Sequence, residues 1–377
     1  LLIAACGVGG GAQSTPSSRP KATPTSVAST SPSGTAPAGS SAALTAVRLQ
    51  LQWSPQAQFA GYFAAMEQGY YEAEGLDVTM VPGGGTIAPQ TAGSAPNGPE
   101  FTVAWVPKVL QAREAGSDLV DIAQVFQRSG TLSVSWKSSN ITKPADFKGK
   151  RIGVWGSGDE FEVTAGAHKV GLEAGTDYTK VIQGSDMSLL LSKEIDVAEA
   201  MIYNEYAQLL ESVNPATGTL VQPTDVNVIN WNDQGSAMLQ DALFARASWL
   251  ALPGNEDVAT RFLKASFKGW IHCRGNPKDC VQYTINAGST LGAGHQAWMM
   301  NEVNPLIWPS PAGIGIMDPA KWQQTVAISK DAGIIKVDPP AAAYRTDLAT
   351  RALSTITEDT KGSDFVKGEV TVTAGGK

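Results

Sequence analysis

Strand-like and helix-like segments alternate along this chain from residue 47 onward, and this alternation limits the possible folds more than any other feature. Residues 47–52 alternate apolar and polar side chains, which is the period of a β-strand. Residues 59–68 follow with a helical pattern that ends at Gly69. A strand–helix order that repeats in this way predicts a parallel-rich sheet covered by helices. The other segments expected in this first unit are strands over 76–81, 101–105 and 119–126 and a helix over 107–115.

A second unit of the same kind begins near residue 132. Strand patterns cover 151–155 and 195–202, and helical patterns cover 160–170 and 187–192. We interpret residues 227–231 as a crossing strand. Beyond about residue 239 the chain returns to long helical patterns, over 256–271, 277–286, 295–306 and 319–332.

Together the two units predict an α/β fold with two lobes. A chain of 377 residues suits two lobes and a tail better than one domain. We place the first lobe at 47–131 and 236–377, and the second at 132–235. The two crossings, expected near 129–133 and 233–240, suit a hinge that closes around a ligand.

Composition argues against several classes of function. The net charge is −7 and no basic run is present, so a nucleic-acid partner is not expected. The three histidines are far apart and no Cys-x-x-Cys pair occurs, so we expect no metal site. No nucleophile–base pair is indicated by the spacing, so we expect no catalytic residue and no enzyme. The histidines are His168, His272 and His295.

The first residues indicate export and lipid attachment. Residues 1–5 read as the end of a signal peptide, and Ile3-Ala4-Ala5-Cys6 resembles the bacterial lipobox. We expect cleavage before Cys6 and a lipid on its thiol, which would anchor the protein to the outer face of the cell membrane. Residues 6–46 are rich in Ser, Thr, Pro, Ala and Gly and would form a tether reaching roughly 35 Å.

Two cysteines late in the chain flank a short loop. Cys273 and Cys280 enclose Arg-Gly-Asn-Pro-Lys-Asp. In an exported protein this spacing indicates a disulfide. Two free buried thiols are the alternative.

Three motifs in the first unit resemble one family. Residues 53–63 read Trp-Ser-Pro-Gln-Ala-Gln-Phe-Ala-Gly-Tyr-Phe, residues 68–78 read Gln-Gly-Tyr-Tyr-Glu-Ala-Glu-Gly-Leu-Asp-Val, and residues 81–85 read Val-Pro-Gly-Gly-Gly. They resemble the periplasmic-binding-protein family that serves thiamine-pyrimidine precursors and riboflavin. Further matches lie at 122–127, 148–155 and 203–205.

The resemblance implies a bilobal periplasmic-binding-protein fold that delivers its ligand to an ABC permease with an ATPase. Residues 227–241 and 270–280 look closest to riboflavin-binding lipoproteins. Eukaryotic pyrimidine synthases share the fold, so an enzyme is one alternative, and a cell-surface adhesion or sensor module is another. Residues 86–100 depart from the family, where Gly, Pro, Ala and Ser interrupt an expected helix.

Residues at the carboxyl ends of strands are the candidate ligand contacts, because ligands bind there in open α/β sheets. Ten tryptophans suit stacking on an aromatic ligand. We expect riboflavin, carried as the transported ligand by a monomer without a cofactor, and a thiamine-precursor pyrimidine is the alternative. Phe59 could instead pack in the core, Gln127 and Thr131 could line a hinge, and Glu205 could cap a helix, as could Asp159 and Glu160. The candidates are Trp53, Phe59, Trp105, Gln127, Thr131, Trp155, Tyr203, Asn204 and Glu205.

Overall fold

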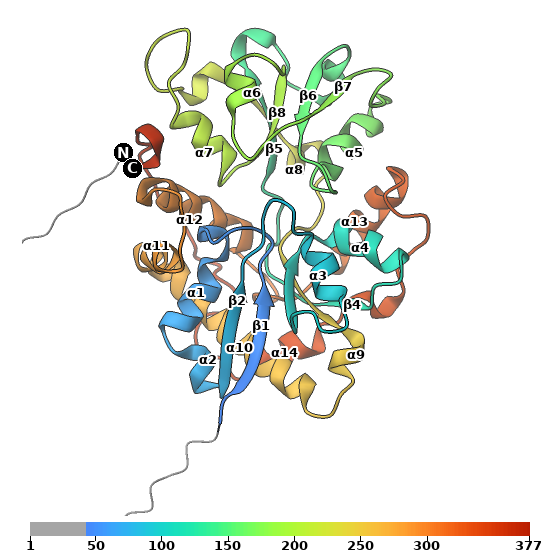
Figure 1. Cartoon of the computed structure of the whole chain (residues 1–377), viewed down its shortest axis with the longest axis vertical. Coiled ribbons are helices and arrows are strands. Elements are labelled where there is room, and N and C mark those ends of the chain that lie inside the picture. Colours follow the sequence, from blue (N-terminus) through green and yellow to red (C-terminus); the bar gives the residue numbers. More distant parts are fainter. Residues whose placement is uncertain (1–42) are drawn as a thin grey trace, which may run out of the picture. The chain divides into compact units, whose positions relative to one another are not determined.

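Two mixed five-stranded sheets form the framework of the described chain (Figure 1). The computed structural model describes residues 43–377, so Cys6 and nearly all of the expected tether lie outside it. In the first sheet β10 runs antiparallel to both neighbours, whereas β1 pairs in parallel with β2 and β3. Its strands, in spatial order, are β2 (Leu76–Val81), β1 (Thr45–Gln50), β3 (Phe101–Ala104), β10 (Ala242–Arg246) and β4 (Leu119–Gln124).

The second sheet repeats this arrangement. Its β5 runs antiparallel to both neighbours, whereas β6 pairs in parallel with β7 and β8. In each sheet the antiparallel strand is the first one that the chain forms after passing from the other sheet. The strands, in spatial order, are β7 (Thr179–Ile182), β6 (Arg151–Val154), β8 (Val197–Met201), β5 (Thr131–Trp136) and β9 (Val226–Asn230).

The expected α/β class is confirmed, but four strands differ from the sequence interpretation. No strand was predicted over β5, where the sequence indicated only that a second unit begins near residue 132. Strand β10 was not expected because all five of its residues are buried, so the strand lacks a polar alternation. Strand β7 was missed because it is a four-residue edge strand with largely exposed side chains. Strand β9 does not cross between the sheets, since it pairs with β5 inside the second one. The proposed lobe boundaries at 131/132 and 235/236 stay predictions.

Most helices lie in the two parts of the chain that also form the first sheet, namely the part up to β4 and the part after β10. Helix α1 ends before Gly69, which adopts a left-handed conformation with φ of 66°. A short helix, α3, forms inside residues 86–100. The helices of these segments are α1 (Ala60–Glu67), α2 (Tyr70–Ala73), α3 (Pro89–Ser94), α4 (Val106–Glu114), α9 (Ala247–Leu250), α10 (Asn255–Gly275), α11 (Pro277–Asn286), α12 (Ala293–Ile307), α13 (Pro319–Asp331) and α14 (Asp347–Leu353).

The remaining helices belong to the segment between β5 and β10. They are α5 (Phe161–Lys169), α6 (Ser188–Leu191), α7 (Glu205–Leu210) and α8 (Trp231–Gln234). Within residues 43–377, no helix combines the length and apolar character that crossing a bilayer requires.

Close packing of α1 against α10 forms a large part of the main core. A Cβ added to Gly269 would come within 2.0 Å of the Gly61 carbonyl oxygen, so only glycine allows the two helices to approach this closely. Trp270 fills the adjacent space and meets Tyr62 edge-on, with ring centroids 5.6 Å apart. Trp270, like Trp231 and Trp308, is fully buried and serves packing rather than recognition.

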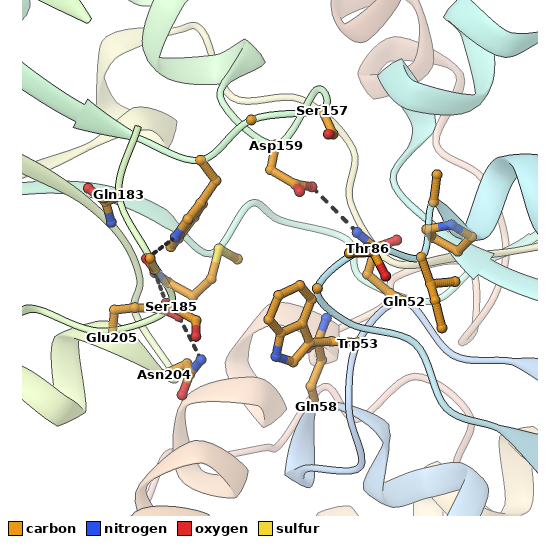
Figure 2. Close-up of a pocket in the computed structure, with 18 of the residues that line it drawn as sticks. Gln52, Trp53, Gln58, Thr86, Ser157, Asp159, Gln183, Ser185, Asn204 and Glu205 are labelled. Carbon is orange, nitrogen blue, oxygen red and sulfur yellow. Dashed lines mark hydrogen bonds between the residues drawn. The ribbon is translucent and has the colours of Figure 1, made fainter. Parts of the chain in front are cut away.

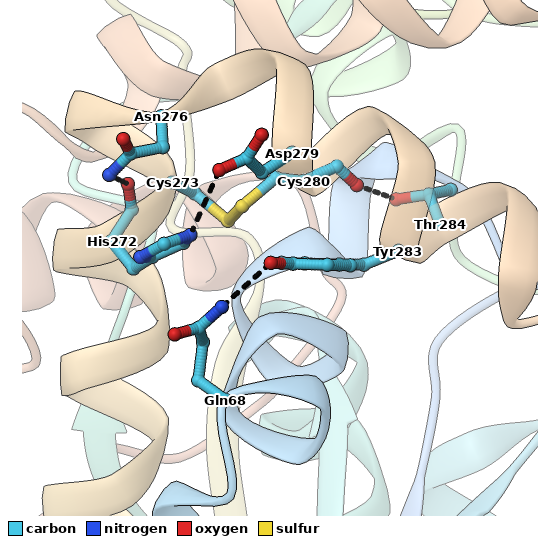
Figure 3. Close-up of a disulfide and its surroundings, with 8 residues drawn as sticks. All are labelled: Gln68, His272, Cys273, Asn276, Asp279, Cys280, Tyr283 and Thr284. Carbon is cyan, nitrogen blue, oxygen red and sulfur yellow. Dashed lines mark hydrogen bonds and ion pairs between the residues drawn. A yellow bond between two sulfur atoms is a disulfide. The ribbon is translucent and has the colours of Figure 1, made fainter.

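A disulfide joins α10 to α11 (Figure 3). The Cα atoms of Cys273 and Cys280 are 5.6 Å apart, and both residues are fully buried. Tyr283 of α11 lies next to the bridge and accepts a hydrogen bond from Gln68 Nε2 at 2.7 Å. The bridge therefore fixes the turn between two helices that both pack against α1.

We predict that Cys273 and Cys280 resist thiol labelling after denaturation without reductant. Replacing both residues by serine should lower the free energy of unfolding by about 2–3 kcal/mol, the loop-closure contribution of so short a loop. Urea titration of the variant and the unmodified protein measures the difference. Labelling of both thiols in native protein that has not been reduced would contradict the prediction.

Candidate functional site

A cavity of about 520 Å³ lies at the carboxyl ends of strands from both sheets. This volume is in the range of small-molecule sites, and the position matches the rule for open α/β sheets. Figure 2 shows Gln52, Trp53 and Thr86 on one side and Asn204 and Glu205 facing them. The lining segments fall within 52–58, 85–89, 155–159, 182–185 and 201–205, together with Lys108.

Trp53 reaches the cavity from the loop that follows β1. The glycine-rich loop after β2 packs directly on it, because Gly83 N–H donates to the Trp53 carbonyl oxygen at 3.0 Å. A Cβ on Gly83 would lie 2.4 Å from the Leu51 carbonyl oxygen, so the close approach requires glycine. Residues 85–89 continue from this loop into the cavity wall. The segment that departs from the family pattern is thus part of the site.

Trp155 enters the cavity from the opposite sheet, directly after β6. Its indole N–H donates to the Gly184 carbonyl oxygen at 3.0 Å, and its backbone N–H donates to Glu199 Oε2 at 2.9 Å. Glu199 is fully buried, and burial raises its pKa well above the usual carboxyl value. One bond therefore holds the Trp155 backbone and the other holds its ring.

Asn204 and Glu205 form a polar corner whose groups are largely engaged within the protein. Asn204 Nδ2 donates to Glu205 Oε1 at 2.7 Å, and the backbone N–H of Met201 donates to Glu205 Oε2 at 2.9 Å. Asn204 Oδ1 lies 3.0 Å from His295 Nε2 and accepts from Gln208 Nε2 at 3.2 Å. The oxygen of Asn204 therefore contacts two protein groups, and its amide nitrogen retains one N–H beyond the bond to Glu205.

Burial also changes the acidity of this corner. It raises the pKa of Glu205 to about 7, against the opposing effect of the hydrogen bonds from Met201 and Asn204. Tyr203, which directly precedes Asn204, lines the cavity and meets Phe126 edge-on, with ring centroids 6.3 Å apart.

An ion pair joins the two sides of the cavity. Lys108 of α4 contacts Asp159, which follows β6, with 2.7 Å between Nζ and Oδ1. Figure 2 shows Asp159 directed across the cavity from the loop that also carries Ser157. Burial raises the pKa of Asp159, and the Lys108 ammonium offsets only part of that shift. Asp159 therefore bridges the cavity, a role that the helix-cap interpretation did not anticipate.

Phe59 and Trp105 lie in the packed interior and do not line this cavity. Phe59 is fully buried in the core. Trp105 donates its indole N–H to Asp241 Oδ1 at 2.7 Å, and Gln58 Nε2 donates to Asp241 Oδ2 at the same distance. Burial raises the pKa of Asp241 to about 7. The Trp105 indole is thus turned toward a buried carboxylate, and two of the three predicted tryptophans, Trp53 and Trp155, reach the cavity.

Gln127 and Thr131 lie where the chain passes between the sheets, also outside the cavity. Gln127 Nε2 donates to the carbonyl oxygen of Gln124 at 2.7 Å. Thr131 Oγ1 accepts from Gln240 Nε2 at 2.6 Å, so the outgoing and returning segments are bonded to each other. Their position beside the crossing segments agrees with the alternative in which they line a hinge, whereas hinge motion itself stays a prediction.

Four glutamines in the cavity wall were not among the sequence candidates. Gln52, Gln56 and Gln58 stand beside Trp53, and Gln183 follows β7. The first three could have been found, because they share the strand end that singled out Trp53. Gln183 could not, because its strand was not recognised. In residues 43–377, no cluster of three His, Cys, Asp or Glu side chains is arranged to hold a metal ion.

Comparison with known proteins identifies the family. A family described as NMT1/THI5 like matches residues 56–280. The chain belongs to this family of solute-binding proteins. The riboflavin-binding protein RibY of Chloroflexus aurantiacus is 25% identical over 308 residues, which cover 78% of this chain and 82% of the relative. The formylaminopyrimidine-binding protein of Halalkalibacterium halodurans is 30% identical over 252 residues, which cover 64% and 71%.

Solved structures share the fold of this NMT1/THI5-like protein. The ligand-binding component of an ABC-type import system from Staphylococcus aureus superposes with a TM-score of 0.58 at 10% identity, covering 82% of this chain and 99% of the other. The desulfurization enzyme DSZB gives 0.55 at 13% identity, covering 82% and 99%. The fold alone therefore does not separate binding from catalysis.

A buried carboxyl group between the two crossing segments makes the stability of the fold depend on pH. Glu162 of α5 accepts from Ser129 Oγ at 2.7 Å and from the Met238 N–H at 2.9 Å, so it joins both crossing segments. Burial raises its pKa from 4.5 to about 8. The folded chain therefore keeps a proton that the unfolded chain releases, and the resulting stability is full below about pH 4.5 and lost as pH rises through about 8.

We predict that Glu162→Gln removes this pH dependence, because glutamine keeps the shape without the titrating proton. The stability of the variant relative to the unmodified protein should rise between about pH 4.5 and 8, by up to about 1.4 kcal/mol per pH unit. Urea unfolding of both proteins at matched pH values measures this difference. Parallel stability–pH curves for the two proteins would contradict the prediction.

Proposed function

We propose that this chain is the extracytoplasmic solute-capturing subunit of an ABC importer and that its ligand is riboflavin. The observation that carries the proposal is the placement of Trp53 and Trp155, which come from opposite sheets and line one cavity. A flat aromatic ligand in that cavity can contact both indoles, which gives the stacking energy that aromatic pairs provide beyond area burial.

The polar lining suits the rest of the flavin. Gln52 and Gln56 offer amide atoms of the kind that bind the hydroxyls of a ribityl chain. The amide groups of Gln58 and Gln183 each donate and accept one bond within the protein. The remaining N–H of Asn204 and the Glu205 carboxyl group can meet the imide edge of the ring system. The similarity to RibY supports the same ligand.

A formylaminopyrimidine-type ligand is the second candidate, favoured by the relative that binds it. A single pyrimidine ring would contact less aromatic surface than the three-ring flavin, and hydrophobic gain grows with buried area at about 25 cal/mol per Å². The larger ligand therefore makes fuller use of two tryptophans.

Binding without catalysis is the proposed mode of action. Cys273 and Cys280 form a disulfide, and neither lines the cavity. The His295 ring is buried between Glu211 and Asn204. We propose that the loaded protein is a monomer, anchored to the membrane through Cys6, that passes its ligand to a permease driven by an ATPase.

We predict that titrating the protein into dilute riboflavin quenches flavin fluorescence and saturates at one site. Trp53→Ala should weaken binding by about 1–3 kcal/mol, or about 5- to 150-fold, because it removes one aromatic anchor. Trp249→Ala is the matched control, since Trp249 belongs to α9, which directly follows β10 and does not line the cavity. Unchanged flavin emission, together with heat release on adding an aminopyrimidine, would favour the second candidate.

We predict that the mature protein begins at a lipidated Cys6. Mass spectrometry of protein extracted from membranes should find an N-terminal fragment with the mass of a diacylglycerol on cysteine. Cys6→Ala should move the protein from the membrane fraction to the soluble fraction. A Cys6→Ala variant that stays in the membrane fraction would contradict the proposed anchor.

A further inference from the structure

We infer that this cavity selects the uncharged form of its ligand and rejects phosphorylated forms, an inference that rests on the proposed function. For riboflavin, the rejected form is its 5′-phosphate ester. The basis is the way in which strong hydrogen-bond donors in and around the cavity are already paired with carboxylates of the protein itself.

The cavity lining offers no cationic side chain without a carboxylate partner. Its acidic and basic residues are Lys108, Asp159 and Glu205, and Lys108 is the single cation among the lining residues that the structure describes. The Lys108 side chain is 4% exposed, and its Nζ lies 2.7 Å from Asp159 Oδ1. A phosphate group carries about −1.5 to −2 charges at neutral pH and would need such a cation. It would have to displace Asp159, which would leave that carboxylate partly buried without its counter-ion.

Two backbone donors of the loop after β6 are also paired with carboxyl groups of the protein. Ser157 and Gly158, with φ of 64° and 93°, form part of the turn that follows β6. Here the Gly158 N–H donates to Glu160 Oε2 at 2.9 Å. Three residues earlier, the Trp155 N–H donates to Glu199. A phosphate at this loop would therefore have to compete with protein carboxyl groups for these two donors.

Side-chain amides repeat the pattern. Asn204 Nδ2 donates to Glu205, and Gln58 Nε2 donates to Asp241. These carboxyl groups consume the donors whether they are ionised or not, so the selection does not require every one of them to be charged. The hydroxyl and imide groups of an uncharged ligand can each make single hydrogen bonds to the amide atoms that remain. Such bonds do not require any carboxyl group of the protein to give up its partner.

The test compares riboflavin with riboflavin 5′-phosphate by fluorescence titration and calorimetry. The readout is the dissociation constant of the phosphate ester divided by that of riboflavin. A general loss of structure weakens the binding of both ligands alike and leaves this ratio unchanged. In the unmodified protein the phosphate ester should bind at least about tenfold more weakly, the lower range for losing one charge-assisted hydrogen bond.

Freeing the cation should relax the selection. Asp159→Asn leaves Lys108 without its counter-ion, and the ratio should fall about tenfold or more. Lys108→Gln removes the cation and should not lower the ratio. Glu173→Gln makes the same change in net charge at an exposed position outside the cavity and should leave the ratio as it was. Glu160→Ala, which removes the acceptor and frees the Gly158 N–H, replaces Asp159→Asn if that variant does not fold, and it too should lower the ratio.

The outcomes separate this inference from the proposed function. Equal affinity for the two ligands in the unmodified protein overturns the inference and leaves riboflavin capture intact. An unchanged ratio in the folded Asp159→Asn or Glu160→Ala variant also overturns it. Absence of binding to both ligands overturns the proposed function itself.

Discussion

The need to satisfy polar groups that are shielded from water governs the region between the two sheets. Asp241, Glu199 and Glu205 are all buried there, and each accepts at least one hydrogen bond from a tryptophan, an amide or the backbone. A buried carboxylate without partners would cost several kcal/mol, so these bonds fix the side chains around them. The rigid position of Trp155 and the inward turn of Trp105 both follow from this requirement.

The double passage of the chain between the sheets brings the site together. The strands that precede the cavity loops are β1, β2, β6, β7 and β8, and they end toward one shared space. The strand formed directly after each passage runs antiparallel to its neighbours, so the crossing segment enters it at the edge where the neighbouring strands end. The crossing segments are bonded to each other and to Glu162, which ties the cavity walls to the junction.

Local signals predicted much of the framework and part of the site. Strand β2 and helix α11 have the bounds that the sequence pattern predicted. The strand alternates apolar and polar residues after a glycine, and the helix begins at a proline. Trp53 and Trp155 follow predicted strands and reach the cavity. Strand β10 escaped prediction because burial on both faces removes the alternation that marks a strand.

The sequence by itself determined the approximate positions of the strands that precede Trp53 and Trp155, because the pattern that marks these strands depends on neighbouring residues. Only the tertiary structure decided which side chains at strand ends share a space. Trp105 and Trp53 have the same local signal, yet the carboxylate of Asp241, 136 residues beyond Trp105, takes the Trp105 indole. Lys108 and Asp159 are 51 residues apart and carry no shared motif. Such pairings are set by how distant segments pack, since the cost of burying a charge depends on the partner that folding brings to it.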